Sequence, residues 1–171
     1  KAERIGKAMM LNPTWNELDR GVWSREKLLQ SFIKEAPDLE QEIRLVFSDL
    51  STIVRKFPKS DSWVQSLKDR GYHVYYLSNY SSHVRKDTEK ELTFMKLMDG
   101  GIMSYEVQLI KPDLVIYQTL MERYDLQPEE CVFLDDTKAN IDGALRAGMQ
   151  GILVKTQEQA MQDLDELLKT N

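Results

Sequence analysis

Two adjacent acidic residues, Asp135 and Asp136, follow a short apolar run and are the chemically most suggestive pair in the sequence. The run Val132–Leu134 has the propensity of a buried strand. Acids at the carboxyl edge of a parallel strand lie where open α/β sheets bind ligands. Because neighbouring carboxylates repel each other, a hard cation such as Mg²⁺ commonly compensates them. The alternative is a solvated acidic turn that caps the following helix.

Ser78, Asn79 and Lys111 are the other residues with suitable chemistry. Ser78 and Asn79 follow an apolar strand pattern, and Lys111 precedes a proline. A hydroxyl and free backbone N–H groups hold phosphate oxygens, and a lysine neutralises a phosphoryl group as a point charge. With Mg²⁺ on a carboxylate pair, these groups suit phosphoryl transfer, but a nucleophile is missing. Each also has an ordinary interpretation, because serines often cap helices and most lysines are exposed.

The elements that must position these residues alternate between helix and strand from residue 58 onward. Strand patterns are expected at 72–77, 102–104, 131–134 and 151–154, and helical patterns at 60–70, 83–98, 112–124, 138–147 and 156–168. Such alternation predicts an α/β fold with a Rossmann-like parallel sheet, helices on both faces and right-handed crossovers. In this fold the polar strand ends can converge on one edge of the sheet.

Residues 1–55 carry only helical patterns. Their apolar residues recur at helical spacing, with breaks at Asn12-Pro13 and Pro37-Asp38. Ser24 is a good N-cap for one of these helices, and Gly21 suits the end of the helix before it. We therefore expect a small all-helical cap over residues 1–55 and a Rossmann-like core over residues 56–171.

Composition narrows the class of protein. The chain has 171 residues, 42% of them hydrophobic and 30% charged, which is typical of a soluble globular protein. Its formal net charge of -5 argues against nucleic acid as a partner. The single cysteine, Cys131, can form no internal disulfide, so a reducing, cytoplasmic location is expected. No apolar run is long enough to cross a bilayer. The first residues, Lys1–Ile5, lack the pattern of a signal peptide, and the sequence does not start with a methionine.

The order of these motifs resembles the haloacid dehalogenase superfamily of phosphohydrolases. Ser78-Asn79 resembles its second motif, Lys111 in Ile110-Lys111-Pro112 its third, and residues 133–140 its fourth, in a double-aspartate form. The sequence is most similar to the branch with a small helical cap. That branch holds sugar-1-phosphate phosphatases and the N-terminal phosphatase domain of soluble epoxide hydrolases, and there residues 17–24 fall in the cap. The resemblance covers essentially the whole chain.

The resemblance also implies roles for individual residues. Asp136, four residues before Asn140, would be the Mg²⁺ ligand, and Asp135 would hold the site in shape. Ser78 and the backbone at Asn79 would bind phosphate, and Lys111 would pair with the nucleophile and the phosphate. The implied activity is Mg²⁺-dependent hydrolysis of a small phosphorylated metabolite, such as a sugar phosphate, through an aspartyl-phosphate, with neither nucleic acid nor membrane as a partner.

One motif of the superfamily is missing. Its first motif is a strand that ends in Asp-x-Asp, whose first aspartate attacks phosphorus. The acids before residue 58 lie in helical patterns instead, so this strand is expected to precede Lys1. The motif order excludes a response-regulator receiver domain, where an acid pair comes first. A dehalogenase on the same fold and a non-catalytic binding or regulatory protein remain as alternatives.

Overall fold

A computed structural model describes residues 1–85 and 87–170, which form two compact units. The first unit comprises residues 1–56, 79–92 and 103–110, and the second comprises residues 57–78, 93–102 and the chain from Lys111 onward. The chain therefore passes between the units several times. Segments 79–92 and 103–110 group with the helical N-terminal part. The division of the chain into a cap over residues 1–55 and a core over residues 56–171 stays a prediction.

The first unit is built from helices. They are α1 (Ala2–Met9), α2 (Thr14–Arg20), α3 (Arg25–Glu35), α4 (Glu40–Ser48), α6 (Ser82–Arg85) and α7 (Ser104–Val107), with 3-10 turns at Pro37–Leu39 and Ser51–Ile53. The Lys27 N–H donates to the Ser24 hydroxyl at 3.3 Å, so the expected N-cap is confirmed. Gly21 ends α2 with a φ of 70°, and a Cβ there would stand 3.0 Å from the Tyr105 Cβ. Glycine thus suits both the backbone and the packing.

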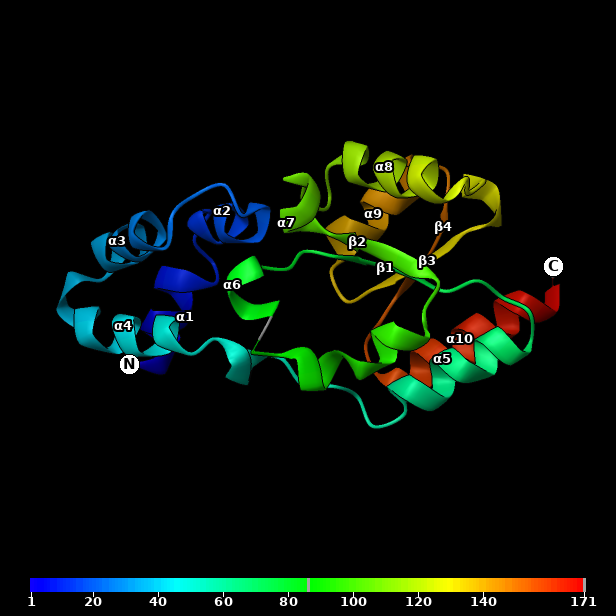
Figure 1. The fold of residues 1–171 in the computed structure, drawn as a ribbon, viewed down its shortest axis with the longest axis horizontal. Helices are drawn as coiled ribbons and strands as arrows, with labels where there is room; N and C mark the ends of the chain where they lie inside the picture. Colours follow the sequence, from blue (N-terminus) through cyan, green and yellow to red (C-terminus); the bar gives the residue numbers. More distant parts are fainter. Residues whose placement is uncertain (86, 171) are drawn as a thin grey trace. The chain divides into compact units, whose positions relative to one another are not determined.

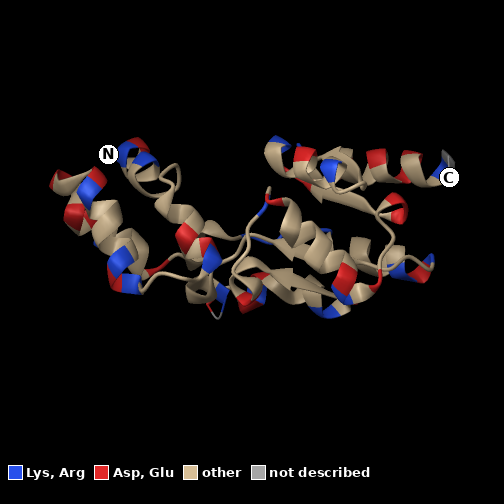
Figure 2. Ribbon diagram, turned by 90° about the horizontal axis from the view of Figure 1, so that it is seen from above, with Lys and Arg blue, Asp and Glu red and all other residues tan. Residues whose placement is uncertain are grey.

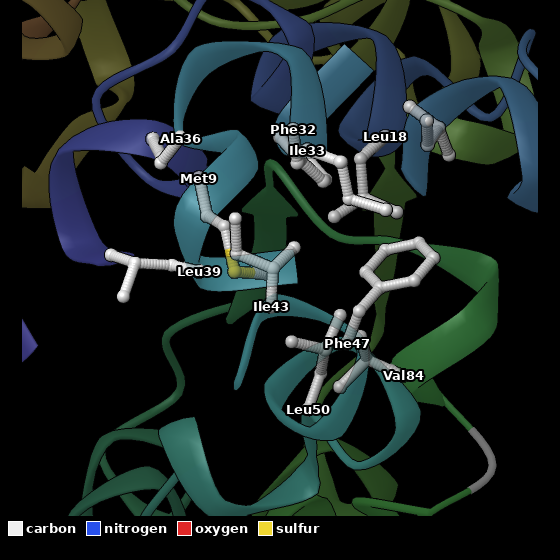
Figure 3. Packing of buried hydrophobic residues seen from close by; sticks show 12 residues of the cluster. Met9, Leu18, Phe32, Ile33, Ala36, Leu39, Ile43, Phe47, Leu50 and Val84 are labelled. Atoms are coloured by element: carbon white, nitrogen blue, oxygen red, sulfur yellow. The ribbon is translucent and has the colours of Figure 1, made fainter. Parts of the chain in front are cut away.

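A continuous apolar core holds the first unit together (Figure 3). Phe32 and Phe47 are fully buried, and their rings meet edge to face with centroids 5.7 Å apart. Met9, Leu39 and Ile43 fill the space beside them. The helical spacing in the sequence thus produces faces that bury their apolar side chains against one another.

Replacing Phe47 with alanine should lower the free energy of unfolding by about 3–5 kcal/mol, because the deletion leaves a cavity in this core. The matched control is Leu45→Ala on the same helix, where the leucine is 72% exposed. Its effect should stay within about 0.5 kcal/mol. Urea unfolding of the two variants checks the difference, and similar losses in both would contradict the assignment of this core.

The second unit has the predicted α/β organisation. Its strands are β1 (Tyr75–Ser78), β2 (Gly100–Met103), β3 (Val132–Asp135) and β4 (Gln150–Leu153), and its α-helices are α5 (Ser60–Asp69), α8 (Leu114–Tyr124), α9 (Lys138–Arg146) and α10 (Gln157–Thr170). Helices α5 and α10 lie on one side of the strands, and α8 and α9 lie on the other (Figure 1). The predicted α/β fold class is confirmed.

The strands of the second unit associate in two pairs, β1 with β2 and β3 with β4. Strands β3 and β4 run parallel, with Val132 opposite Gln150 and Asp135 opposite Leu153. Within the described residues, β1 and β3 each pair with a single strand. An edge of each of these strands is thus open to a further partner.

Three local predictions need correction. Residues 83–98 do not form one α-helix: α6 ends at Arg85, residue 86 lies outside the described residues, and Glu89–Leu97 is a 3-10 helix interrupted at Leu92. The polar sequence there lacks a continuous apolar face. Pro112 precedes α8 rather than opening it, because the extended residue Asp113 separates it from Leu114, where the helix begins. Strand β1 is shorter than predicted, since residues 72–74 lie outside it.

Positions of both charge signs occur on the helices of each unit. Figure 2 shows Lys and Arg segments interspersed with Asp and Glu segments, and several pairs lie one helical turn apart, such as Arg44 with Glu40 and Lys138 with Asp142. These exposed pairs add little to stability. Within residues 1–85 and 87–170, no helix combines the length and apolar character that crossing a bilayer requires.

Candidate active site

A buried ion pair joins two of the predicted site residues. The Lys111 ammonium donates to Asp135 Oδ2 at 2.6 Å, and both side chains are only 8% exposed. The ammonium also donates to the Leu77 carbonyl oxygen at 2.8 Å and lies 5.2 Å from the centre of the Phe133 ring. Lys111 therefore links the carboxyl ends of β1 and β3. The interpretation of Lys111 as a solvated surface lysine was wrong, because its charge is compensated inside the protein.

The second oxygen of Asp135 is held from the start of α9. Asp135 Oδ1 accepts a hydrogen bond from the Thr137 N–H at 2.8 Å and another from Asn140 Nδ2 at 2.9 Å. With Lys111 on the other oxygen, the carboxylate is fixed on both sides. Hydrogen bonds of this kind determine the orientation of a carboxylate. This geometry suits the predicted role of Asp135 in holding the site in shape.

Asp136 differs from its neighbour in exposure. The residue is exposed, and a long hydrogen bond of 3.4 Å from the Thr137 hydroxyl reaches its Oδ1. In residues 1–85 and 87–170, no group of three or more His, Cys, Asp and Glu side chains is arranged to hold a metal ion. Asp136 therefore offers one carboxylate rather than a complete ligand cage.

This arrangement is compatible with Mg²⁺. The ion prefers hard oxygen ligands, keeps several of its waters and commonly takes only one or two carboxylates besides substrate phosphate. Asp136 supplies an accessible carboxylate, while the buried Asp135 is already bound by Lys111, Thr137 and Asn140. Of the two acids, Asp136 is thus the better candidate for the metal ligand.

The predicted phosphate-binding residues lie at the end of β1. Ser78 is the last residue of this strand and follows Leu77, whose carbonyl oxygen accepts from Lys111. Ser78 is therefore one residue away from the carbonyl group that Lys111 contacts, and both residues belong to the second unit. Asn79 begins the next segment of the first unit, where it lines a surface hollow.

Tyr117 of α8 also contributes to this site. Its fully buried hydroxyl donates to the Asn140 carbonyl oxygen at 2.7 Å, and its ring meets Phe133 edge to face. Burial raises the pKa of the Tyr117 hydroxyl, and the nearby Asp135 charge adds to this. The hydroxyl therefore stays protonated at neutral pH and supports the turn that carries Asn140.

Replacing Tyr117 with phenylalanine should lower the free energy of unfolding by about 0.5–1.5 kcal/mol, the usual net value of one buried hydrogen bond. The same change at the exposed Tyr72 is the control and should stay within about 0.5 kcal/mol. Urea unfolding measures both. A Tyr117→Phe variant as stable as the control would mean that this hydrogen bond does not support the site.

Comparison with known proteins places the chain among hydrolases. The family model of haloacid dehalogenase-like hydrolases matches residues 6–148. Over 107 residues, 61% of the chain, the sequence is 31% identical to a glyceraldehyde 3-phosphate phosphatase of Methanothermobacter thermautotrophicus. Over 125 residues, 73% of the chain, it is 22% identical to (S)-2-haloacid dehalogenase 4A of Burkholderia cepacia. The chain spans 47% and 52% of the length of these two relatives.

Solved structures show the same fold. One of them is an enzyme of this family from Bacteroides thetaiotaomicron, crystallised with magnesium and inorganic phosphate. Its TM-score is 0.68 at 17% identity, over 92% of this chain and 88% of the other. At this level of identity the likeness concerns the fold alone.

Proposed function

The chain belongs to the haloacid dehalogenase-like hydrolase family, and from this premise we propose that it carries most of the active site of a Mg²⁺-dependent phosphatase for a small phosphorylated metabolite. The observation that carries the proposal is the buried Lys111–Asp135 pair next to the exposed Asp136. A fixed cation and an accessible carboxylate at adjoining strand ends suit a site that stabilises phosphoryl oxygens.

Each site residue has a distinct role in this proposal. Asp136 would hold Mg²⁺ together with water and the substrate phosphate, and the ion would neutralise phosphoryl charge. Asp135 keeps the Lys111 ammonium in position, and Asn140 keeps Asp135 in position. The Ser78 hydroxyl and the backbone N–H of Asn79 would bind phosphate oxygens at the end of β1. Residues 1–55 would act as a cap that excludes water.

The nucleophile of this reaction would be an aspartate from a segment outside residues 1–171. Its carboxylate oxygen would bond to phosphorus while the ester P–O bond breaks and the leaving alcohol takes up a proton. Water would then hydrolyse the aspartyl-phosphate and release inorganic phosphate. Two observations support a strand that carries it: β1 and β3 each pair with one strand within the described residues, and Lys111 contacts both.

Phosphate and halide release by the intact protein distinguish the candidate activities. We expect phosphate release from a panel of metabolite phosphates in the presence of Mg²⁺ and its loss when EDTA removes the metal. Metal-independent halide release from 2-haloacids would favour the dehalogenase, an activity that one relative carries. A folded intact protein that releases neither product would favour a binding or regulatory role on the same fold.

A further inference from the structure

Helix α9 contacts the segments that carry both members of the buried ion pair, Lys111 and Asp135. In its first turn, Asn140 Nδ2 donates a hydrogen bond to Asp135 Oδ1 at 2.9 Å. At its last residue, Arg146 Nη2 donates to the Pro112 carbonyl oxygen at 3.2 Å. Pro112 directly follows Lys111 in the chain. One end of α9 is therefore bonded to the acid of the pair, and the other end to the residue beside the lysine.

Helix α9 is a firm support for these two bonds, because it packs closely on both of its neighbours. Its inner face buries Ile141 and Ala144. A Cβ at Gly151 of β4 would stand 2.8 Å from Ile141 Cγ2. A Cβ at Gly143 would likewise stand 2.8 Å from the Tyr117 hydroxyl oxygen of α8, which lies beside α9 (Figure 1). A nine-residue helix is about 13.5 Å long at 1.5 Å per residue, so α9 holds its two attachment points at a fixed separation.

The backbone beside Lys111 needs such a support. A lysine has a flexible four-carbon stem, so the place of its ammonium depends on where its backbone lies. The Lys111 ammonium has to reach the Leu77 carbonyl oxygen and its acidic partner together. Pro112 has no N–H to donate, so its carbonyl is the backbone group that can anchor this residue. The planar guanidinium of Arg146 gives the bond to that carbonyl a definite direction.

A basic residue in the last turn of a helix also has an ordinary role. Its positive charge interacts favourably with the free carbonyl groups at the helix end and stabilises the helix. For Arg146, the guanidinium donates to a carbonyl oxygen outside its own helix, 34 residues away in the chain. The bond therefore connects α9 to another segment of the second unit, and its loss should affect that segment as well as the helix.

We propose that Arg146 is a positioning residue of the active site. It fixes the backbone beside Lys111, so that the ammonium stays between the Leu77 carbonyl oxygen and Asp135. Arg146 itself does not touch the substrate and acts only through Lys111. This inference rests on the phosphatase function proposed above, and it adds a residue at the far end of α9 to the groups on which phosphate release depends.

The first test measures phosphate release from p-nitrophenyl phosphate by the intact protein with Mg²⁺. Arg146→Gln should lower kcat by about 3–10-fold and change KM by less than about twofold, because a displaced ammonium loses contact with the transition state. Arg146→Lys should recover most of kcat, since lysine keeps a charged donor of similar reach. The matched control is Arg70→Gln, which removes a guanidinium paired with Asp165 in the same unit and should leave kcat unchanged.

The second test asks whether Arg146 acts through Lys111. In a Lys111→Met background, adding Arg146→Gln should lower kcat no further, because the group that it positions is already gone. A residue that only stabilises the helix end would cause the same fold loss in both backgrounds. That result, or an unchanged kcat in Arg146→Gln alone, would overturn this inference and leave the phosphatase function standing. Absence of phosphate release from every ester by the unsubstituted intact protein would instead refute the proposed function.

Discussion

Replacing Lys111 with methionine should reduce phosphate release by the intact protein by about 10²–10³-fold, the usual effect of removing one charge-stabilising group from a site. The substitution removes the ammonium that connects the Leu77 carbonyl oxygen with Asp135 and leaves the Asp135 carboxylate buried without its cation. An uncompensated buried charge costs about 3–5 kcal/mol in the free energy of unfolding. Kinetic assays and urea unfolding measure the two effects separately.

Two further variants separate the chemical role of Lys111 from its structural role. Lys138→Met removes the same charge from an exposed lysine that pairs with Asp142, and both activity and stability should change little. Adding Asp135→Asn to Lys111→Met removes the unpaired charge, so stability should recover in part while activity stays low. If Lys111→Met alone keeps full activity, Lys111 does not act on the phosphoryl group and the proposed site is wrong.

Replacing Asp136 with asparagine should remove measurable Mg²⁺ binding, because the change deletes a full negative charge from the accessible carboxylate that would face the ion. Asp135→Asn should weaken binding less, by about 10–100-fold, as expected for a group that only supports the metal site. The reason lies in the contacts of Asp135, since both of its oxygens already accept hydrogen bonds from protein donors. Isothermal titration of the intact protein with Mg²⁺ measures both effects.

Asp142→Asn is the matched control for this pair. Asp142 is a surface acid on α9 that forms an ion pair with Lys138, and its replacement should leave Mg²⁺ binding unchanged. Each variant should first be shown to unfold cooperatively, so that lost binding is not mistaken for lost folding. Equal losses in Asp135→Asn and Asp136→Asn would mean that the division of roles between the two acids is unsupported.

Local features of the fold could be predicted from the sequence because they depend on neighbouring residues. The capping box before α10 is an example: the Gln159 N–H donates to the Thr156 hydroxyl, and the Gln159 side chain accepts from the Thr156 N–H. Gly21 at the end of α2 is another. The alternation of helix and strand after residue 58 then indicated the α/β class, since parallel strands need crossover helices. Where periodicity was weak, at residues 83–98, the prediction failed.

The candidate site shows what tertiary structure alone decided. The sequence indicated that Lys111, Asp135 and Asp136 belong together, but it left open which acid is buried and whether the lysine is solvated. Packing decides this, because the partners of Lys111 lie 34 and 24 residues away in the chain. The buried hydroxyl of Ser104 likewise reaches the Asp19 carbonyl oxygen across 85 residues. Such distant contacts depend on how whole elements pack together, and no local pattern of residues encodes them.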